Sequence, residues 1–235
     1  MNLSVKIVQK NLLWHFLSTF ASMKCFTDTE YIHSLISEGE HQRQDFKFEI
    51  SDARKIAKTF SAFANTDGGR LLIGVKDNGK IAGVRSDEEQ YMIEAAAQIY
   101  CLPKVSYAMR TFHAEGRNVL VVQIEESWQK PVYAIDETGK PLAYLRIKDE
   151  NILATPVHLR VWQQSCKSCG ELLTYTERER MLLDLLEKNE CLSLNQYCKL
   201  AHLSRYAAEH LLAKLIRFEI VEPVFEGHKF HFRLK

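Results

Sequence analysis

The sequence predicts an α+β protein in which a mixed or antiparallel sheet with packed helices is followed by a small, mostly helical domain. Two observations support this prediction. Helical spacing and strand-like alternation of apolar residues follow one another up to residue 164, and helical spacing dominates from residue 172 onward. The segment between them, residues 165–171, is small and polar, as linkers are. We therefore expect domains over residues 23–164 and 172–235.

The composition excludes several classes of protein. Of the 235 residues, 46% are hydrophobic and 26% are charged, which is ordinary for a folded globular protein. The formal net charge is +1, so any affinity for nucleic acid has to come from a local patch of positive charge. The six cysteines are scattered irregularly, unlike a disulfide framework, and this favours a reducing, cytoplasmic setting.

Residues 1–22 resemble a poor signal peptide. They contain Lys6, Lys10 and an apolar run, but His15 interrupts the run and no small-x-small cleavage site follows. The run is also too short to span a membrane. We therefore expect no membrane partner and favour an extraneous or poorly ordered leader over export. A start of translation at Met23 is the alternative.

Each element expected in the first domain has its own signal. Residues 44–50 alternate, with Phe46, Phe48 and Ile50 on one face and charged residues on the other, which predicts a half-buried strand. Apolar residues then recur at helical spacing after Ser51, the expected N-cap, and Asp67-Gly68-Gly69 is expected to stop that helix. The other expected helices are 29–37, 87–100 and 157–164, and the other expected strands are 71–75, 81–84, 105–112, 118–125, 131–134 and 143–147. We expect the helices to cover one face of the sheet.

Residues 62–84 are the most informative stretch of the chain. They join the end of a helix to a buried strand at 71–75 and, through the turn Asp77-Asn78-Gly79, to a second strand at 81–84. We expect these two strands to form a hairpin. The positions to which we assign a structural role are Asn65, Gly68, Gly69, Gly74 and Gly79.

This stretch, taken with Asp45-Phe46-Lys47 upstream, resembles the Schlafen AlbA-type domain, which has also been labelled a divergent AAA or ATP-binding domain. The resemblance covers roughly residues 28–164. It implies a nucleic-acid-handling domain and, in some members, a metal-dependent ribonuclease. It also implies a homodimer with a positively lined groove. Candidates for lining that groove are Arg54, Lys55, Lys58, Arg110 and Arg146.

Three carboxylates form the hypothetical catalytic and metal-binding set. Glu40, Asp45 and Asp77 could converge on a Mg²⁺ or Mn²⁺ ion, because hard cations prefer oxygen ligands and activate water. The resemblance implies acidic residues at these positions, although Asp45 stands where the family usually has Glu. Lys47, on the same strand face, is a candidate phosphate contact. The alternative is that all three acids are solvated surface groups.

ATP and zinc are not expected as cofactors. The segment from Gly69 to Gly74 lacks the Gly-Lys-Ser/Thr of a phosphate-binding loop, and its amides belong to a strand. Cys166-x-x-Cys169 is half of a zinc-site pattern, but Cys191 and Cys198 are not spaced like a second half.

The second domain has the layout of a winged helix-turn-helix. Helices are expected at 177–188, 194–201 and 205–218, followed by a hairpin over 220–233. Residues 191–235 hold seven Lys or Arg residues against four Glu residues, a net charge of +3. This favours contact with DNA, although winged helices also bind proteins. The candidate contacts on the third helix are Arg205, Tyr206, Glu209, His210 and Lys214.

Together these features predict a protein that binds DNA or RNA as a transcriptional regulator. The first alternative is a metal-dependent endoribonuclease that uses the three carboxylates. A nucleotide-binding regulator is a second, weaker alternative.

Overall fold

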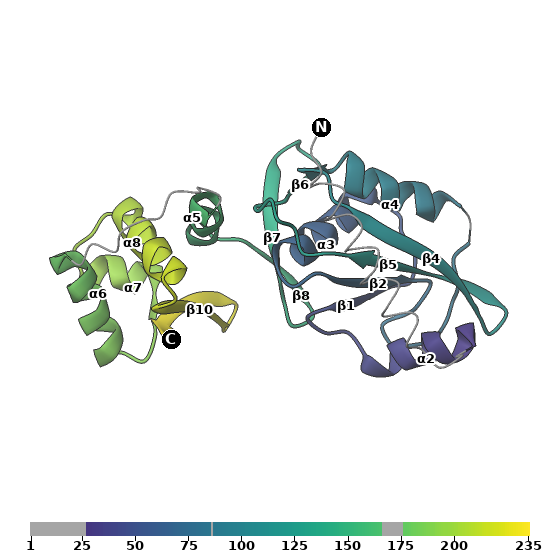
Figure 1. The fold of residues 1–235 in the computed structure, drawn as a ribbon, viewed down its shortest axis with the longest axis horizontal. Helices are drawn as coiled ribbons and strands as arrows, with labels where there is room; N and C mark the ends of the chain where they lie inside the picture. Colours follow the sequence, from purple (N-terminus) through teal and green to yellow (C-terminus); the bar gives the residue numbers. More distant parts are fainter. Residues whose placement is uncertain (1–26, 86, 166–175) are drawn as a thin grey trace, which may run out of the picture.

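The computed structural model describes residues 27–85, 87–165 and 176–235. The expectations for the leader, for the start at Met1 or Met23, and for Cys166-x-x-Cys169 lie outside the described residues. The described chain forms a first unit, from α2 (Asp28–Glu38) to β8 (Glu150–Leu153), and a second unit, from α6 (Glu177–Lys188) to β11 (Lys229–Leu234). Helix α5 (Pro156–Ser165) lies between them (Figure 1). Within the described ranges, no helix combines the length and the apolar character that crossing a bilayer requires.

The first unit is built on a four-stranded mixed sheet with the order β1-β2-β5-β4. Its strands are β1 (Gln44–Lys47), β2 (Gly69–Ile73), β4 (Tyr107–Ala114) and β5 (Arg117–Ile124). β1 and β2 run parallel, and the other pairs are antiparallel. In β2, Leu71, Leu72 and Ile73 are all fully buried although they alternate between faces. Both faces of this sheet are therefore covered.

Helices pack on both faces of this sheet, not on one face as the sequence led us to expect. On one face lies α2 (Asp28–Glu38), whose Ile32 joins a buried cluster with Phe46 and Leu72. On the other lies α3 (Ala53–Asn65), whose Phe60 packs with Leu71 and the alternate residues of β5. Figure 1 shows the two helices on either side of the strands. The side chain of Asp52, not Ser51, caps α3 by accepting from the Arg54 amide.

A second four-stranded sheet covers α3 on the side away from β2. Its order is β3-β6-β7-β8, with β3 (Cys101–Leu102), β6 (Tyr133–Ile135), β7 (Pro141–Ile147) and β8 (Glu150–Leu153), all antiparallel. α4 (Glu88–Gln98) packs beside α3. The side-chain nitrogen Nδ2 of Asn65 donates to the carbonyls of Val132 (2.8 Å) and Tyr144 (3.0 Å). This side chain therefore joins α3 to the second sheet.

The expected hairpin between 71–75 and 81–84 is wrong. Residues 81–84 form no strand, and only an isolated bridge joins Val75 to Ile81. Both edges of β2 are already paired, with β1 and β5. The amides of Ala82 and Gly83 instead donate to the Gly74 carbonyl at 2.7 and 2.9 Å, which folds this segment into a tight loop.

The second unit contains three helices and a three-stranded sheet. The helices are α6 (Glu177–Lys188), α7 (Leu194–Leu200) and α8 (Arg205–Arg217), and the strands are β9 (Leu192–Ser193), β10 (Val221–Glu226) and β11 (Lys229–Leu234) in the order β10-β11-β9. Leu182, Tyr197, Leu212 and Phe232 form part of one buried cluster. The three helices and the hairpin that the sequence predicts are therefore present.

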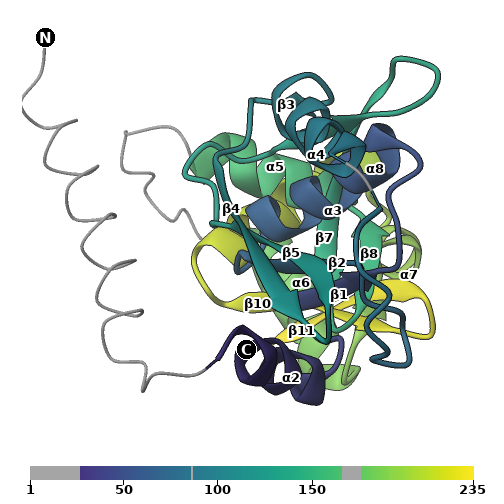
Figure 2. The ribbon, with the colours of Figure 1, turned by 90° about the vertical axis from the view of Figure 1, so that its right-hand side faces the viewer.

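Helix α5 (Pro156–Ser165) belongs to both units by its contacts. It lies within the residues that we expected to form the first domain, but Val157 is buried in the cluster of the second unit. On its other side, Leu159 and Trp162 pack against Ala143 and Leu145 of the first unit. Figure 2 looks along the long axis of the molecule, with the first unit nearest the viewer and the second unit behind it. The polypeptide thus passes between the units through a helix that packs against each.

Candidate nucleic-acid interface

A basic pocket opens on the first unit, where the strand ends of β1 and β2 meet the tip of the β4–β5 hairpin. Its volume is about 590 Å³. The lining includes the cationic residues Lys76, Lys80, Arg85 and Arg117, together with His113 and the ring of Phe48. None of the described residues that line it is acidic. Such a pocket attracts anions, because the field of several cations adds up inside a concave surface.

The turn between Lys76 and Lys80 places two of these lysines at the pocket. The Lys76 amide donates to the Lys80 carbonyl (3.0 Å), and the Gly79 amide donates to the Lys76 carbonyl (2.7 Å). Gly79 has φ +78°, a conformation that side chains other than those of Asn and Asp rarely adopt. The Asp-Asn-Gly sequence therefore makes a tight turn, and both lysines at its base line the pocket.

The neighbouring loop approaches β2 so closely that glycine is required. A Cβ atom on Gly74, which has φ +92°, would lie 2.8 Å from the carbonyl carbon of Gly83. This contact holds residues 82–85 beside the end of β2 and brings Arg85 to the pocket.

Phe48 contributes an aromatic surface beside these charges. It follows β1, and because β1 and β2 are parallel, the residues after both strands emerge at one edge of the sheet. The Lys76 ammonium lies 5.0 Å from the centre of the Phe48 ring, and the Arg85 guanidinium carbon lies 5.5 Å from it. Both distances suit cation–π attraction, which holds the two charges at the pocket.

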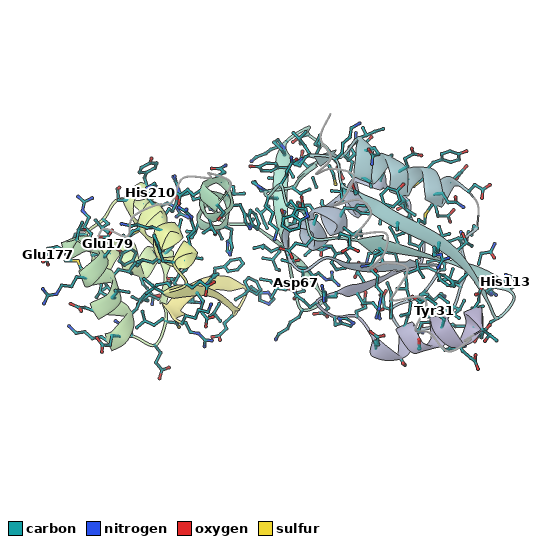
Figure 3. All side chains as sticks on the ribbon, viewed as in Figure 1. Tyr31, Asp67, His113, Glu177, Glu179 and His210 are labelled. Atoms are coloured by element: carbon teal, nitrogen blue, oxygen red, sulfur yellow. The ribbon has the colours of Figure 1, made fainter. Side chains whose placement is uncertain are left out.

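The hairpin between β4 and β5 forms the opposite wall. Arg117 donates from its guanidinium to the Ala82 carbonyl, and the Val84 amide donates to the Asn118 carbonyl at 2.8 Å. His113 contacts Asn118 at 3.0 Å through its ring nitrogen, while its amide donates to the Asp28 carboxylate at the start of α2. Figure 3 shows His113 at the end of the first unit that is far from the second unit.

The three carboxylates proposed as a metal site are not brought together. Asp45 is 3% exposed and pairs with Arg146 (3.1 Å) and Lys47 (2.8 Å). Glu40 lies close to Asp45 and accepts from the Phe46 amide at 2.9 Å. Asp77 is exposed in its turn. Among the described residues, no three His, Cys, Asp or Glu side chains are grouped so as to hold a metal ion.

The electrostatics around Asp45 also suit a structural role. Burial raises the pKa of Glu40, and the neighbouring Asp45 carboxylate raises it further, while the Phe46 amide opposes both effects. Since Asp45 already has two cationic partners, its charge is compensated without a metal. The residues that are present therefore do not fit the divalent ion that the resemblance implies.

The expected position of Arg146 in a surface groove is wrong. Its side chain is 1% exposed, donates to Asn151 (2.9 Å) and lies over the ring of Phe63 at 5.2 Å. The other groove candidates lie elsewhere on the first unit. Lys55 is exposed and Lys58 is half-buried on α3. Arg54, also on α3, packs over the Tyr100 ring, and Arg110 is exposed on β4. None of these residues is among the described lining of the basic pocket.

On α8 the candidate contacts divide between two faces. Arg205, Tyr206 and His210 are exposed, and the rings of the latter two stack with centroids 6.3 Å apart. Glu209 is buried and pairs with both Arg160 and Arg205, so it is not a base contact. Lys214, which we expected on the solvent face, is a further correction. Its side chain is 12% exposed and pairs with Glu179 at 2.7 Å.

The lining residues of the basic pocket carry no distinctive signal in the sequence. Lys76 and Lys80 flank the predicted turn at Asp77-Asn78-Gly79, where lysines are ordinary surface residues. Arg85 follows these lysines closely in sequence, but Arg117 is distant from them, and only the contact of residues 82–84 with the hairpin brings it to the pocket.

Comparison with known proteins supports the resemblance for the first unit. Residues 40–155 match the family model "Schlafen, AlbA_2", and the match ends immediately before α5. No curated protein matches the chain.

Two solved structures are similar. The DIP2311 protein from Corynebacterium diphtheriae has 17% identity and a TM-score of 0.43, over 62% of this chain and 33% of that one. This chain thus spans about a third of that protein. The N-terminal domain of a putative ATP-dependent DNA helicase RecG-related protein from Nitrosomonas europaea has 23% identity and a TM-score of 0.41, over 65% of this chain and 99% of that one.

Proposed function

We propose, from the Schlafen AlbA_2 match of residues 40–155 and the basic pocket within them, that this protein binds nucleic acid. The observation that carries the proposal is the convergence of Lys76, Lys80, Arg85 and Arg117 on one pocket. The net charge of the chain is only +1, so affinity for phosphates requires a local excess of cations, and these four line one pocket with no acidic residue in its described lining.

The second unit extends the proposal to a DNA-binding regulator. Its three helices and hairpin have the element order of a winged helix-turn-helix, in which α8 would be the recognition helix. Arg205, Tyr206 and His210 present cationic and hydrogen-bonding groups on the exposed face of α8. We propose that α8 contacts duplex DNA and that the protein acts as a homodimer in transcriptional regulation.

Hydrolysis is not part of the proposal. Asp45 is held by Arg146 and Lys47, and Asp77 is exposed and apart from it. No metal-dependent step is derived for carboxylates in this arrangement.

The test is the salt dependence of binding by a charge-neutralised variant. Fluorescence anisotropy with labelled single-stranded and duplex oligonucleotides would measure the affinity of the parent and of Lys76→Gln/Lys80→Gln. If the lysines contact phosphates, the variant loses affinity and the slope of log K against log salt becomes shallower by about one unit per lysine.

The matched control is Lys104→Gln/Lys140→Gln, which removes the same charge from exposed positions outside the described pocket lining. Equal losses in the two double variants would show a nonspecific effect of net charge. The absence of binding by the parent protein at micromolar concentration would refute the proposed function.

A further inference from the structure

We infer that the basic pocket takes an unpaired nucleotide of a single-stranded nucleic acid, with its base stacked on Phe48. This inference rests on the proposed function and specifies the ligand of the pocket. It differs from the duplex contact proposed for α8.

The size of the pocket favours a single nucleotide. Its volume of about 590 Å³ lies in the range of small-molecule sites. The bases of a duplex are stacked inside the helix and offer only their edges to a protein. An unpaired base in a single strand is free to leave the stack and enter a pocket.

Phe48 gives the pocket a surface for the base. Its ring is half-buried and lines the pocket, so its orientation is fixed while part of it faces the ligand. Bases of any sequence stack on aromatic rings, which is how proteins bind single strands with little sequence preference.

The Arg85 side chain, which now lies over the Phe48 ring, can move aside for a base and then pack on the other face of that base. The Arg85 side chain is 71% exposed, and the Glu49 carboxylate, its partner at 3.3 Å, is 45% exposed. Exposed ion pairs contribute little to stability, and so does an exposed cation–π contact such as that of Arg85 with Phe48, so the guanidinium can move at small cost. A base inserted against Phe48 would have the guanidinium plane on its other face, an arrangement that proteins use for unpaired bases.

The remaining cations are placed for the phosphates on either side of that base. Lys76 and Lys80 come from the turn after β2, and Arg117 comes from the hairpin on the opposite wall. Arg117 is anchored to the Ala82 carbonyl through one guanidinium nitrogen, and its other nitrogens remain donors. A strand that crosses the pocket would therefore meet positive charge before and after the stacked base.

The first test compares ligands and Phe48 variants of the full chain by fluorescence anisotropy. We expect Phe48→Leu to lower affinity for single-stranded oligonucleotides about tenfold, because it keeps an apolar side chain but removes the stacking surface. Phe48→Tyr should restore it. Binding of the matched duplex should not change. Single-stranded RNA and DNA of one sequence would show which sugar is preferred.

Phe112→Leu is the control, since Phe112 is a half-buried ring that packs on Tyr31 outside the described pocket lining. The inference is overturned if Phe48→Leu and Phe112→Leu have the same effect, or if Phe48→Leu weakens duplex binding equally. In both cases the salt-dependent binding of the proposed function would still stand. If the parent binds no nucleic acid, both proposals fail.

A second measurement uses the parent protein, so its result cannot be caused by a variant that fails to fold. When an oligonucleotide that contains 5-iodouridine is irradiated, the modified base forms a covalent bond to an aromatic side chain that stacks on it. We expect mass spectrometry of the irradiated parent complex to find the oligonucleotide on the peptide that contains Phe48. Attachment only to the peptide that contains Tyr206 would assign single strands to α8 and overturn the inference.

Discussion

At the scale of single residues, the pair of Arg146 and Asp45 shows how a buried charge holds the first unit together. Both side chains are almost fully buried, and they come from β7 and β1, which lie in different sheets. Arg146 also donates to the Gln44 carbonyl and to Asn151. Each partner therefore compensates a charge whose desolvation would otherwise be costly.

We predict that Arg146→Met destabilises the first unit by about 3 to 5 kcal/mol, because Asp45 keeps a buried charge with a weaker set of partners. Urea denaturation followed by circular dichroism would measure the loss. Adding Asp45→Asn should recover part of it, since the orphaned charge is then removed. A single Arg146→Met variant as stable as the parent would contradict a structural role and reopen the assignment of Arg146 to nucleic-acid contact.

At the scale of elements, His158 of α5 contacts the second unit. The ring of His158 packs edge-on against Phe230 of β11, with centroids 4.5 Å apart. Its Nδ1 accepts from the Thr155 amide (3.3 Å) and is 2.7 Å from the Thr155 hydroxyl, which therefore donates. Burial lowers the pKa of His158 from 6.5 to about 4, so the ring is neutral in the folded protein.

We predict that stability falls as the pH drops from 6.5 to about 4, because in this window the unfolded chain binds a proton that folded His158 does not. The loss from this group is at most about 3 kcal/mol. Urea midpoints measured across this pH range would show it, and His158→Gln should flatten the profile. His210→Gln, which changes an exposed histidine, is the control, and an equal flattening by both variants would exclude His158 as the cause.

The elements also show what the sequence could and could not predict. The positions of α3, β5 and α8 follow from apolar spacing and caps, which are local signals. The pairing of β2 with β1 instead of with residues 81–84 is not local, because the spacing of glycines fits a hairpin as well as a tight loop. β3 and β9 were missed because strands of two residues are too short to show alternation, and β8 was missed because its polar and apolar residues come in pairs and do not alternate.

The candidate site was predicted less well for the same reason. The sequence around a lysine or arginine does not show whether its side chain is exposed to solvent or paired with an acid in the interior. Arg146 and Lys214 were expected at the surface. Arg146 is buried against Asp45 and Lys214 is half-buried against Glu179, and both partners are distant in sequence. Arg205, Tyr206 and His210 lie on the exposed face, as helical spacing from the buried leucines predicts.

At the scale of the whole molecule, the two proposed binding surfaces lie far apart. Figure 3 shows His113, beside the basic pocket, and His210, on α8, at opposite ends of the molecule. A short oligonucleotide therefore occupies one surface at a time, and the two surfaces can differ in the ligand that they prefer.

We predict that Arg205→Gln/His210→Gln weakens binding of duplex DNA while leaving the affinity for a short single strand at its parent value. Both side chains are exposed, and Arg160 remains beside the buried Glu209 when Arg205 is replaced, so the effect on stability should be about 1 kcal/mol or less. Electrophoretic mobility shifts with duplex and single-stranded probes would check this. The control removes two exposed cations from α6, Arg178→Gln/Lys188→Gln. Loss of both ligands in the α8 variant would show that the two surfaces act as one.

Because α5 packs against both units, it limits where the coding sequence can be divided. A fragment that ends at Ser165 would keep α5 but lose the second unit, and it would leave Val157 and Val161 without the cluster that covers them. A fragment that ends at Thr155 would remove α5 and uncover mainly Ala143, Leu145 and Ala154, two of which are alanines with little apolar surface. In recombination, a new C-terminal module could therefore replace the present one most easily at residue 155, and a module joined after α5 would have to bring its own apolar groove for that helix.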